Sequence, residues 1–292
     1  GEVFVIGGEA DPRELGGEYY GHHPDLCLRG TIEEVEVSSP KAWAGSRTMS
    51  HQQSATPVDI GTRVEMFVDD WLIDQKRGVE LKLQTPVKRE VVIEFDKPWE
   101  GPQSAYVTVF LDGDKVRMYY RGWCLSDLDA EQVTCYAEST DGIHFARPSL
   151  GLYEFDASSR SVAAGSPISP RRATDNNIIL QGVWAHNFSP FLDANPAAKP
   201  EERYKAVAGL GGKSGGLFGF VSADGVHWRE MSKEPLTQDG AFDSLNLAFW
   251  DRLTGCYRLY SRYFADGFRA IQSATSQDFV HWSDQQPNLY GI

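Results

Sequence analysis

Ser-Thr-Asp-Gly-Ile-His-Phe, residues 139–145, is the stretch that decides the fold, because it recurs twice further along the chain. The second copy is Ser-Ala-Asp-Gly-Val-His-Trp, residues 222–228, and the third is Ser-Gln-Asp-Phe-Val-His-Trp, residues 276–282. In each copy a strand-like run enters, an aspartate marks a turn and a histidine–aromatic pair leaves. The aspartates are 83 and 54 residues apart. Repetition at such intervals is typical of a β-propeller.

Strand-like runs precede each copy of this seven-residue motif, which we call the box. Residues 106–111 and 115–120 flank Asp112-Gly113-Asp114, and an Asp-Gly pair suits the positive-φ positions of a hairpin turn. Residues 133–139 then lead into the first box. The runs of the second repeat are residues 188–192, 203–208 and 217–222, and those of the third are 245–250, 256–262 and 268–273. A repeat of about fifty residues with roughly four strands is the period of a propeller blade.

The long first interval has its own explanation. Residues 156–173 are rich in serine, alanine and proline and lack periodicity, which indicates an inserted loop. No segment shows the apolar period of an amphipathic helix. The sequence therefore predicts an all-β chain with about three propeller blades. Three blades cannot close a ring, because the edges of the outer sheets would stay unpaired. We therefore expect the chain to be a fragment.

The composition of the chain divides it into three regions. Residues 1–46 read as short strands punctuated by glycine, and residues 47–62 form a small, polar and aperiodic linker. Residues 63–292 carry the partial propeller, truncated at its C-terminus. Within this last region, residues 64–68 are the candidate for an N-terminal strand that completes the last blade.

Charge and composition narrow the functional classes. Hydrophobic residues make up 41% of the 292 residues, which is enough for a packed core. The net charge of −13 argues against nucleic acid as a partner, and no apolar run approaches the length of a membrane span. The cysteines show no CxxC pair and no zinc-ligand spacing. A Cys124–Cys135 bridge and buried thiols are both open alternatives.

The repeats resemble the blades of five-bladed propeller glycoside hydrolases of the invertase and arabinanase type, families 32 and 43. The resemblance covers roughly residues 64–292. It rests on the three boxes and on residues 112–123, 186–196, 203–206 and 242–251. Upstream, residues 30–38 (Gly-Thr-Ile-Glu-Glu-Val-Glu-Val-Ser) resemble the last strand of a laminin-G or concanavalin-A-like sandwich. That resemblance implies that residues 1–46 are a short β-sandwich remnant.

The propeller resemblance implies a funnel at the ring axis, with acids on the innermost strands. Glycoside hydrolysis needs two carboxyl groups facing each other across the glycosidic oxygen. Asp243, where the family usually has glutamate, and Glu100 are the candidate catalytic residues. A Glu-Gly-Pro turn is an alternative, purely structural role for Glu100. The second blade departs from the family pattern, since Ser189-Pro190 stands where Asp-Pro is expected.

Six further side chains are candidate substrate contacts, because most of them precede an inner strand or end a second strand. They are His186, Asn187, Arg121, Trp123, Arg262 and Asn246. A tryptophan in such a place can stack on a sugar face. The aspartates and histidines of the boxes are expected to serve the scaffold, since their repetition marks a turn geometry.

Two functional classes follow. The first is a secreted or periplasmic glycoside hydrolase that cleaves a plant or algal poly- or oligosaccharide with a carboxylate pair. It would need no cofactor, although a structural calcium ion in the propeller centre is possible. The second is a non-catalytic propeller that binds carbohydrate or protein, motivated by the missing Asp-Pro. A sialidase-like hydrolase is a third option and would need an arginine cluster, for which only Arg121 and Arg262 are well placed.

Overall fold

The computed structural model describes residues 73, 77–79, 82, 85–101, 103–123, 132–156, 172–209 and 215–288. The sandwich remnant expected at 1–46, the linker at 47–62 and the closing strand at 64–68 lie outside these residues. The described residues from Val91 onward belong to one compact unit.

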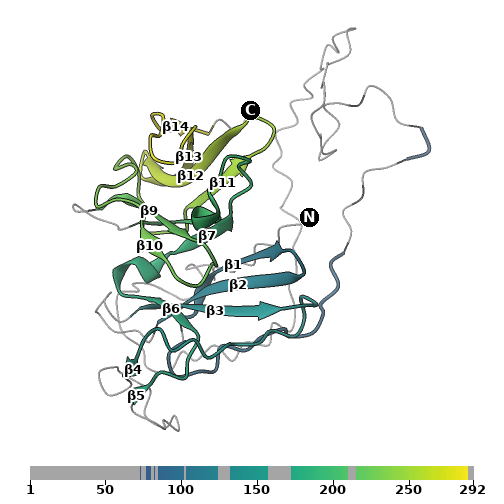
Figure 1. The fold of residues 1–292 in the computed structure, drawn as a ribbon. Coiled ribbons are helices and arrows are strands. Elements are labelled where there is room, and N and C mark those ends of the chain that lie inside the picture. Colours follow the sequence, from purple (N-terminus) through teal and green to yellow (C-terminus); the bar gives the residue numbers. More distant parts are fainter. Residues whose placement is uncertain are drawn as a thin grey trace. The chain divides into compact units, whose positions relative to one another are not determined.

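Three four-stranded antiparallel sheets follow one another along this unit (Figure 1). The first contains β1 (Ala105–Asp112), β2 (Lys115–Gly122), β3 (Val133–Ser139) and β6 (Ile178–Gln181). The second contains β7 (Ser189–Leu192), β8 (Tyr204–Gly209), β9 (Leu217–Ser222) and β10 (Arg229–Glu230). The third contains β11 (Leu247–Asp251), β12 (Cys256–Ala265), β13 (Phe268–Ser276) and β14 (Gln286–Pro287). Within the described residues, the prediction of an all-β fold with one antiparallel sheet per repeat is confirmed.

In the second and third sheets, consecutive strands pair, and in the first sheet β3 pairs with β6, beyond a separate two-stranded sheet. This antiparallel order is the strand pattern of a propeller blade. The first strands are neighbours in space, since β1 lies beside β7 and β7 beside β11. The hairpin expected at residues 112–114 joins β1 to β2, and Gly113 adopts a φ of 65° there. The strand pair β4 (Phe155–Asp156) and β5 (Arg172–Ala173) flanks the region predicted as an insertion. Two 3₁₀ turns, η4 (Val183–His186) and η5 (Pro200–Glu202), precede β7 and β8.

The three boxes fold into the same turn, as their repetition predicted. The serine Oγ accepts a hydrogen bond of 2.9 Å from the backbone N–H three residues on, in every copy. The aspartate Oδ1 accepts from the histidine N–H at 2.8 Å, and the aspartate Oδ2 lies 2.7 Å from the histidine Nδ1. These bonds are local to the turn and occupy both groups, so the box aspartates and histidines belong to the scaffold.

Aromatic side chains fill the spaces between the sheets. Tyr119 and Tyr136 of the first sheet pack with Val226 and Trp228 of the second box. In the next layer, side chains of β8 and β9 pack with residues of the third sheet and with Phe279 of the third box. The second and third box turns therefore pack against the preceding sheet, so the fold depends on contacts between sheets as well as within them.

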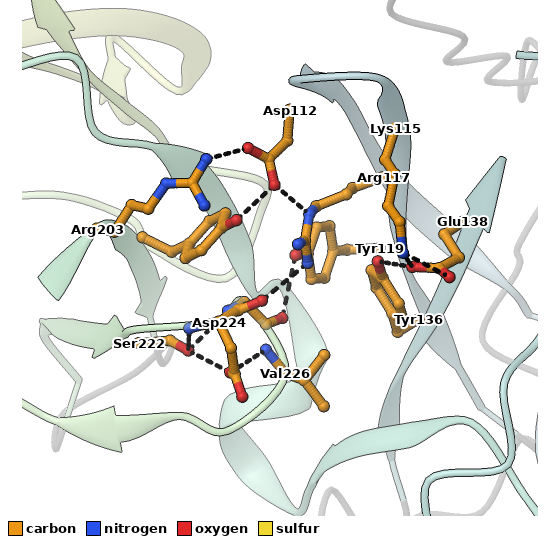
Figure 2. A network of polar contacts seen from close by, with 12 residues as sticks. Asp112, Lys115, Arg117, Tyr119, Tyr136, Glu138, Arg203, Ser222, Asp224 and Val226 are labelled. Carbon is orange, nitrogen blue, oxygen red and sulfur yellow. Dashed lines mark hydrogen bonds and ion pairs between the residues drawn. The ribbon is translucent and has the colours of Figure 1, made fainter. Parts of the chain in front are cut away.

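A polar network links the first sheet to the second (Figure 2). Asp112 accepts hydrogen bonds from Arg117 of its own sheet and from Arg203 and Tyr204 of the next. Arg117 also donates to the Asp224 carbonyl oxygen at 2.8 Å, in the second box. Burial raises the pKa of the Asp112 carboxyl, but the Tyr204 hydroxyl and the two guanidinium groups outweigh burial and hold the pKa below its ordinary value.

The second and third sheets are joined in the same way. Asp193, which directly follows β7, is fully buried and accepts from Lys205 of β8 at 2.7 Å and from Tyr257 of β12 at 2.7 Å. The Lys205 ammonium also lies 5.9 Å from the ring of Phe279, in the third box. In the first and second sheets, an acid at the end of the first strand thus holds a cation of its own sheet and a tyrosine of the next.

Candidate functional site

The ends of the inner strands bring seven of the eight candidate residues together. They form one contact network with three residues that the sequence did not single out. We call this network the His186 cluster; it consists of Gln103, Tyr106, Arg121, Trp123, Gln132, His186, Asn187, Asp243, Asn246 and Arg262. The eighth candidate, Glu100, lies apart.

His186 lies at the centre of the cluster because it ends η4 directly before the inner strand β7. Its Nε2 donates to the Asp243 carbonyl oxygen at 3.0 Å, and its Nδ1 lies 2.9 Å from Gln132 Oε1. The rings of Tyr106 and Trp123 meet it edge to face, with centroids 5.9 and 6.0 Å away. His186 therefore connects the first sheet to the loop before β11 of the third.

Arg121, at the end of β2, is 9% exposed. Its guanidinium donates to the carbonyl oxygens of His186 at 3.3 Å and Gln103 at 3.4 Å. It also lies over the rings of Tyr106 and Trp123, 4.6 and 5.0 Å from their centroids. Burial lowers the pKa of Arg121, although the Tyr106 hydroxyl partly offsets this effect. Its Nε has no hydrogen-bond partner.

Asp243, in the loop before β11, presents the accessible carboxylate of the cluster. Its side chain is 52% exposed, and Arg262 Nη2 donates to its Oδ1. Arg262 itself is 11% exposed, and its Nε lacks a partner. A carboxylate in an ion pair can act as a base or nucleophile in glycoside hydrolysis.

Asn187 and Asn246 hold the main chain on both sides of Asp243. Both asparagines are fully buried, and each Nδ2 donates to the carbonyl oxygens of Phe242 and Ser244. Asn187 Oδ1 accepts from the Gly209 N–H at 2.9 Å, so its amide is fully occupied. These contacts favour a positioning role for Asn187 over the sugar contact expected from the sequence. Asn246 keeps one buried oxygen, Oδ1, without a partner.

Glu100 is fully buried, and its carboxylate lies apart from the cluster, although its carbonyl oxygen accepts from the Trp123 N–H at 2.8 Å. Its oxygens accept from Arg147 Nε at 2.8 Å and Nη2 at 3.2 Å, from the Tyr120 hydroxyl and from the Lys97 N–H. Tyr120 and Arg121 are consecutive on β2, so their side chains lie on opposite faces of the sheet. Glu100 lies on the Tyr120 face and the cluster on the Arg121 face. The structure therefore favours the structural role for Glu100 over the catalytic one.

Tyr106 is a site residue that the sequence did not reveal. It has a φ of 53°, rare for a residue with a side chain, and it sits where the β1–β2 register shifts between Ala105 and Thr108. Such backbone strain costs about 1–3 kcal/mol and is often found at functional sites. Strand propensity alone gives no signal of this bulge. Gln103 and Gln132 were missed because nothing local distinguishes them from other loop glutamines.

Unpartnered polar atoms concentrate in the cluster. Seven buried side-chain atoms in the described part of the chain have no hydrogen-bond partner, and four of them belong to Gln103, Arg121, Asn246 and Arg262. Unpaired buried polar atoms are costly, and in native proteins they often mark a ligand site. Two are donors and two are acceptors, which matches sugar hydroxyls because these both donate and accept.

The described residues give no indication of a metal centre or a membrane span. No group of three or more His, Cys, Asp or Glu side chains among them could hold a metal ion. None of their helices is long and apolar enough to cross a membrane. Cys135 and Cys256 are buried thiols, which favours the second of the two cysteine alternatives for Cys135.

Comparison with known proteins returns distant structural neighbours only. No family model and no curated protein matches the chain. A glycosyl hydrolase from Bacteroides ovatus has a TM-score of 0.37 at 15% identity, over 64% of this chain and 49% of that one. An N-acetylgalactosamine deacetylase from F. plautii has a TM-score of 0.44 at 15% identity, over 67% and 56%. Fructan 1-exohydrolase IIa from Cichorium intybus has a TM-score of 0.41 at 12% identity, over 66% and 35%.

The chain thus spans about half, or less, of the length of these solved structures. Several further neighbours are also glycoside hydrolases, including a thermostable family-43 enzyme. The TM-scores are low, so the fold and the site described above rest on the sheets and contacts of this chain alone.

Proposed function

We propose that the His186 cluster binds a carbohydrate and that Asp243 takes part in hydrolysing its glycosidic bond. The observation that carries the proposal is the setting of Asp243. It is a half-exposed carboxylate whose neighbouring carbonyls are held by two buried asparagines. Fixed placement of a reactive group is what catalysis requires.

The rest of the cluster suits a sugar. The rings of Trp123 and Tyr106 are flat surfaces of the kind on which sugar rings stack, and the unpartnered atoms of Gln103 and Asn246 can meet hydroxyls. Ion pairing with Arg262 suits Asp243 to act as base or nucleophile. The described part of the cluster holds no second carboxylate to serve as the proton donor. His186 and Tyr106 are the ionisable candidates within reach of the cluster.

The isosteric Asp243→Asn variant tests this role. We expect it to stay folded, to bind oligosaccharides and to lose hydrolysis by about a hundredfold or more, the usual contribution of a general acid or base. Asp266→Asn is the matched control, because Asp266 lies in the exposed turn between β12 and β13 and asparagine tolerates its φ of 51°. Hydrolysis that survives in Asp243→Asn would exclude Asp243 as the reacting carboxylate.

A second candidate function is binding without catalysis. The burial of Glu100 favours it, because that carboxylate is unavailable as a partner for Asp243. Binding of oligosaccharides by the native protein without turnover, over a panel of glycosides, would support this alternative.

The remaining parts of the proposal concern the context of the site. We infer that the three sheets are blades of a five-bladed ring and that the protein acts outside the cell or in the periplasm. A plant or algal polysaccharide is the proposed substrate. Fractionation of cells that produce the protein tests the location.

A further inference from the structure

We propose that the sugar bound by the His186 cluster carries an oxyanion, a carboxylate or a sulfate ester, and that Arg121 and Arg262 hold this group. The inference rests on the proposed function only in taking the ligand to be a carbohydrate. Its main support is that the described cluster contains two guanidinium groups and one carboxylate.

Among the described residues, no acidic side chain pairs with the buried guanidinium of Arg121. A guanidinium stays protonated in proteins, and burying an unpaired charge is costly. Within the described residues, Arg121 makes two long hydrogen bonds to carbonyl oxygens and contacts the side chains of Tyr106 and Trp123, and no carboxylate contacts it. The anionic group of a bound ligand would neutralise the buried charge of Arg121.

The other cations in this fold show that Arg121 is exceptional. Arg117, Arg147, Arg258 and Lys205 are all at least partly buried, and each forms an ion pair with an aspartate or glutamate at 2.6–2.8 Å. These pairs hold the sheets together. Arg121 lies instead at the inner end of β2, beside the candidate reacting groups, and its Nε–H is unused.

Arg262 adds a second guanidinium to the cluster, through its ion pair with Asp243. Its only acidic contact in the described chain is Asp243, the candidate reacting carboxylate, and its Nε–H is also unused. The cluster therefore contains two guanidinium groups and one carboxylate, within a chain whose net charge is −13. Planar guanidinium groups match carboxylate and sulfate oxygens through paired N–H donors.

The test compares three oligosaccharides of equal length: an oligogalacturonide, a sulfated oligosaccharide and a neutral one. Binding is measured by calorimetry at fixed ionic strength on the native protein and on Arg121→Met, Arg262→Met and the control Arg252→Met. Arg252 lies in the exposed turn between β11 and β12, so its replacement changes the net charge equally without touching the cluster.

We expect the native protein to bind at least one of the acidic ligands about tenfold or more tightly than the neutral one. Arg121→Met and Arg262→Met should lose this preference, and Arg252→Met should keep it. The uronate and sulfate arms identify which oxyanion the site takes. Equal affinity for acidic and neutral ligands, absence of binding to any of the three, or a preference that survives in Arg121→Met would overturn the proposal.

Stability gives an independent readout. If Arg121 lacks a counter-ion in the unliganded protein, its replacement by methionine leaves the melting temperature unchanged or raises it. A large fall would show that Arg121 serves the fold, which contradicts the proposal. Acidic ligands that bind but are never cleaved would refute hydrolysis and leave this inference standing. Cleavage of neutral glycosides without a preference for acidic ligands would support hydrolysis and refute this inference.

Discussion

Gly225→Ala should destabilise the protein much more than Gly142→Ala, although the two glycines occupy the same position of the first two boxes. Their φ values are 78° and 76°, so the backbone strain of an alanine is about 1–2 kcal/mol in both. Their surroundings differ. A Cβ on Gly142 would meet only Val116 Cγ2 at 3.8 Å, an ordinary contact. A Cβ on Gly225 would lie 2.7 Å from the Tyr119 hydroxyl and 2.9 Å from Arg117 Nη1.

Neither of these two groups can move away without loss. The Tyr119 hydroxyl donates to the Gly225 carbonyl oxygen at 3.0 Å, its ring is fully buried, and Arg117 donates to the Asp224 carbonyl oxygen. Losing one or both bonds adds about 1–3 kcal/mol to the strain. That difference corresponds to a gap in melting temperature of about 2–12 °C between the variants.

Thermal unfolding of both variants, followed by circular dichroism, measures the gap. Gly142→Ala serves as the control, because it carries the same backbone strain without the contact. Equal melting temperatures would refute the view that the box turn of one sheet is a contact with the sheet before it.

Three further predictions concern stability. Phe279→Gly should destabilise the protein by about 1–4 kcal/mol in denaturant unfolding. Relief of the backbone strain at φ 68° offsets only part of the cost of removing a fully buried ring. A stabilised variant would contradict this expectation. Glu100→Gln should lower the unfolding free energy by about 3–5 kcal/mol, because it removes the buried partner of Arg147 and leaves it with the exposed Asp96 at 3.5 Å, while oligosaccharide affinity stays unchanged. A loss of affinity in the folded variant would return Glu100 to the site. The hydrogen bond from Arg258 lowers the pKa of Asp251 from 3.8 to about 2. The stabilising contribution of the Asp251 carboxylate is therefore complete above pH 3.8 and is lost as the pH falls towards 2. Asp251→Asn should flatten the pH dependence of the unfolding free energy over this range, and an unchanged pH profile would exclude the effect.

The order of the sheets could be predicted because the boxes are local. Serine, aspartate and histidine within six residues make all the bonds of the turn, so the sequence pattern and the structure contain the same information. The outermost strands could not be located in this way. Two of them, β10 and β14, are only two residues long, and β6 follows a long inserted region. Their place is decided by the neighbouring strand rather than by their own residues.

The candidate site was predictable as a location but not in its chemistry. Polar residues at the ends of inner strands converge wherever these strands converge, which identified His186, Arg121, Asp243 and Arg262. The partner of Glu100 lies 47 residues further along the chain, and no local pattern indicates that Arg147 removes this carboxylate from the site. The strained backbone of Tyr106 arises from a shift in strand register, which is likewise a property of the sheet.

The most direct test of the account is a crystal structure of the protein with a bound acidic oligosaccharide. The account predicts that the sugar contacts Trp123 and Asp243 and that its oxyanion contacts Arg121 or Arg262. Well-ordered sugar bound elsewhere, for example against the box turns, with the His186 cluster left untouched, would contradict it.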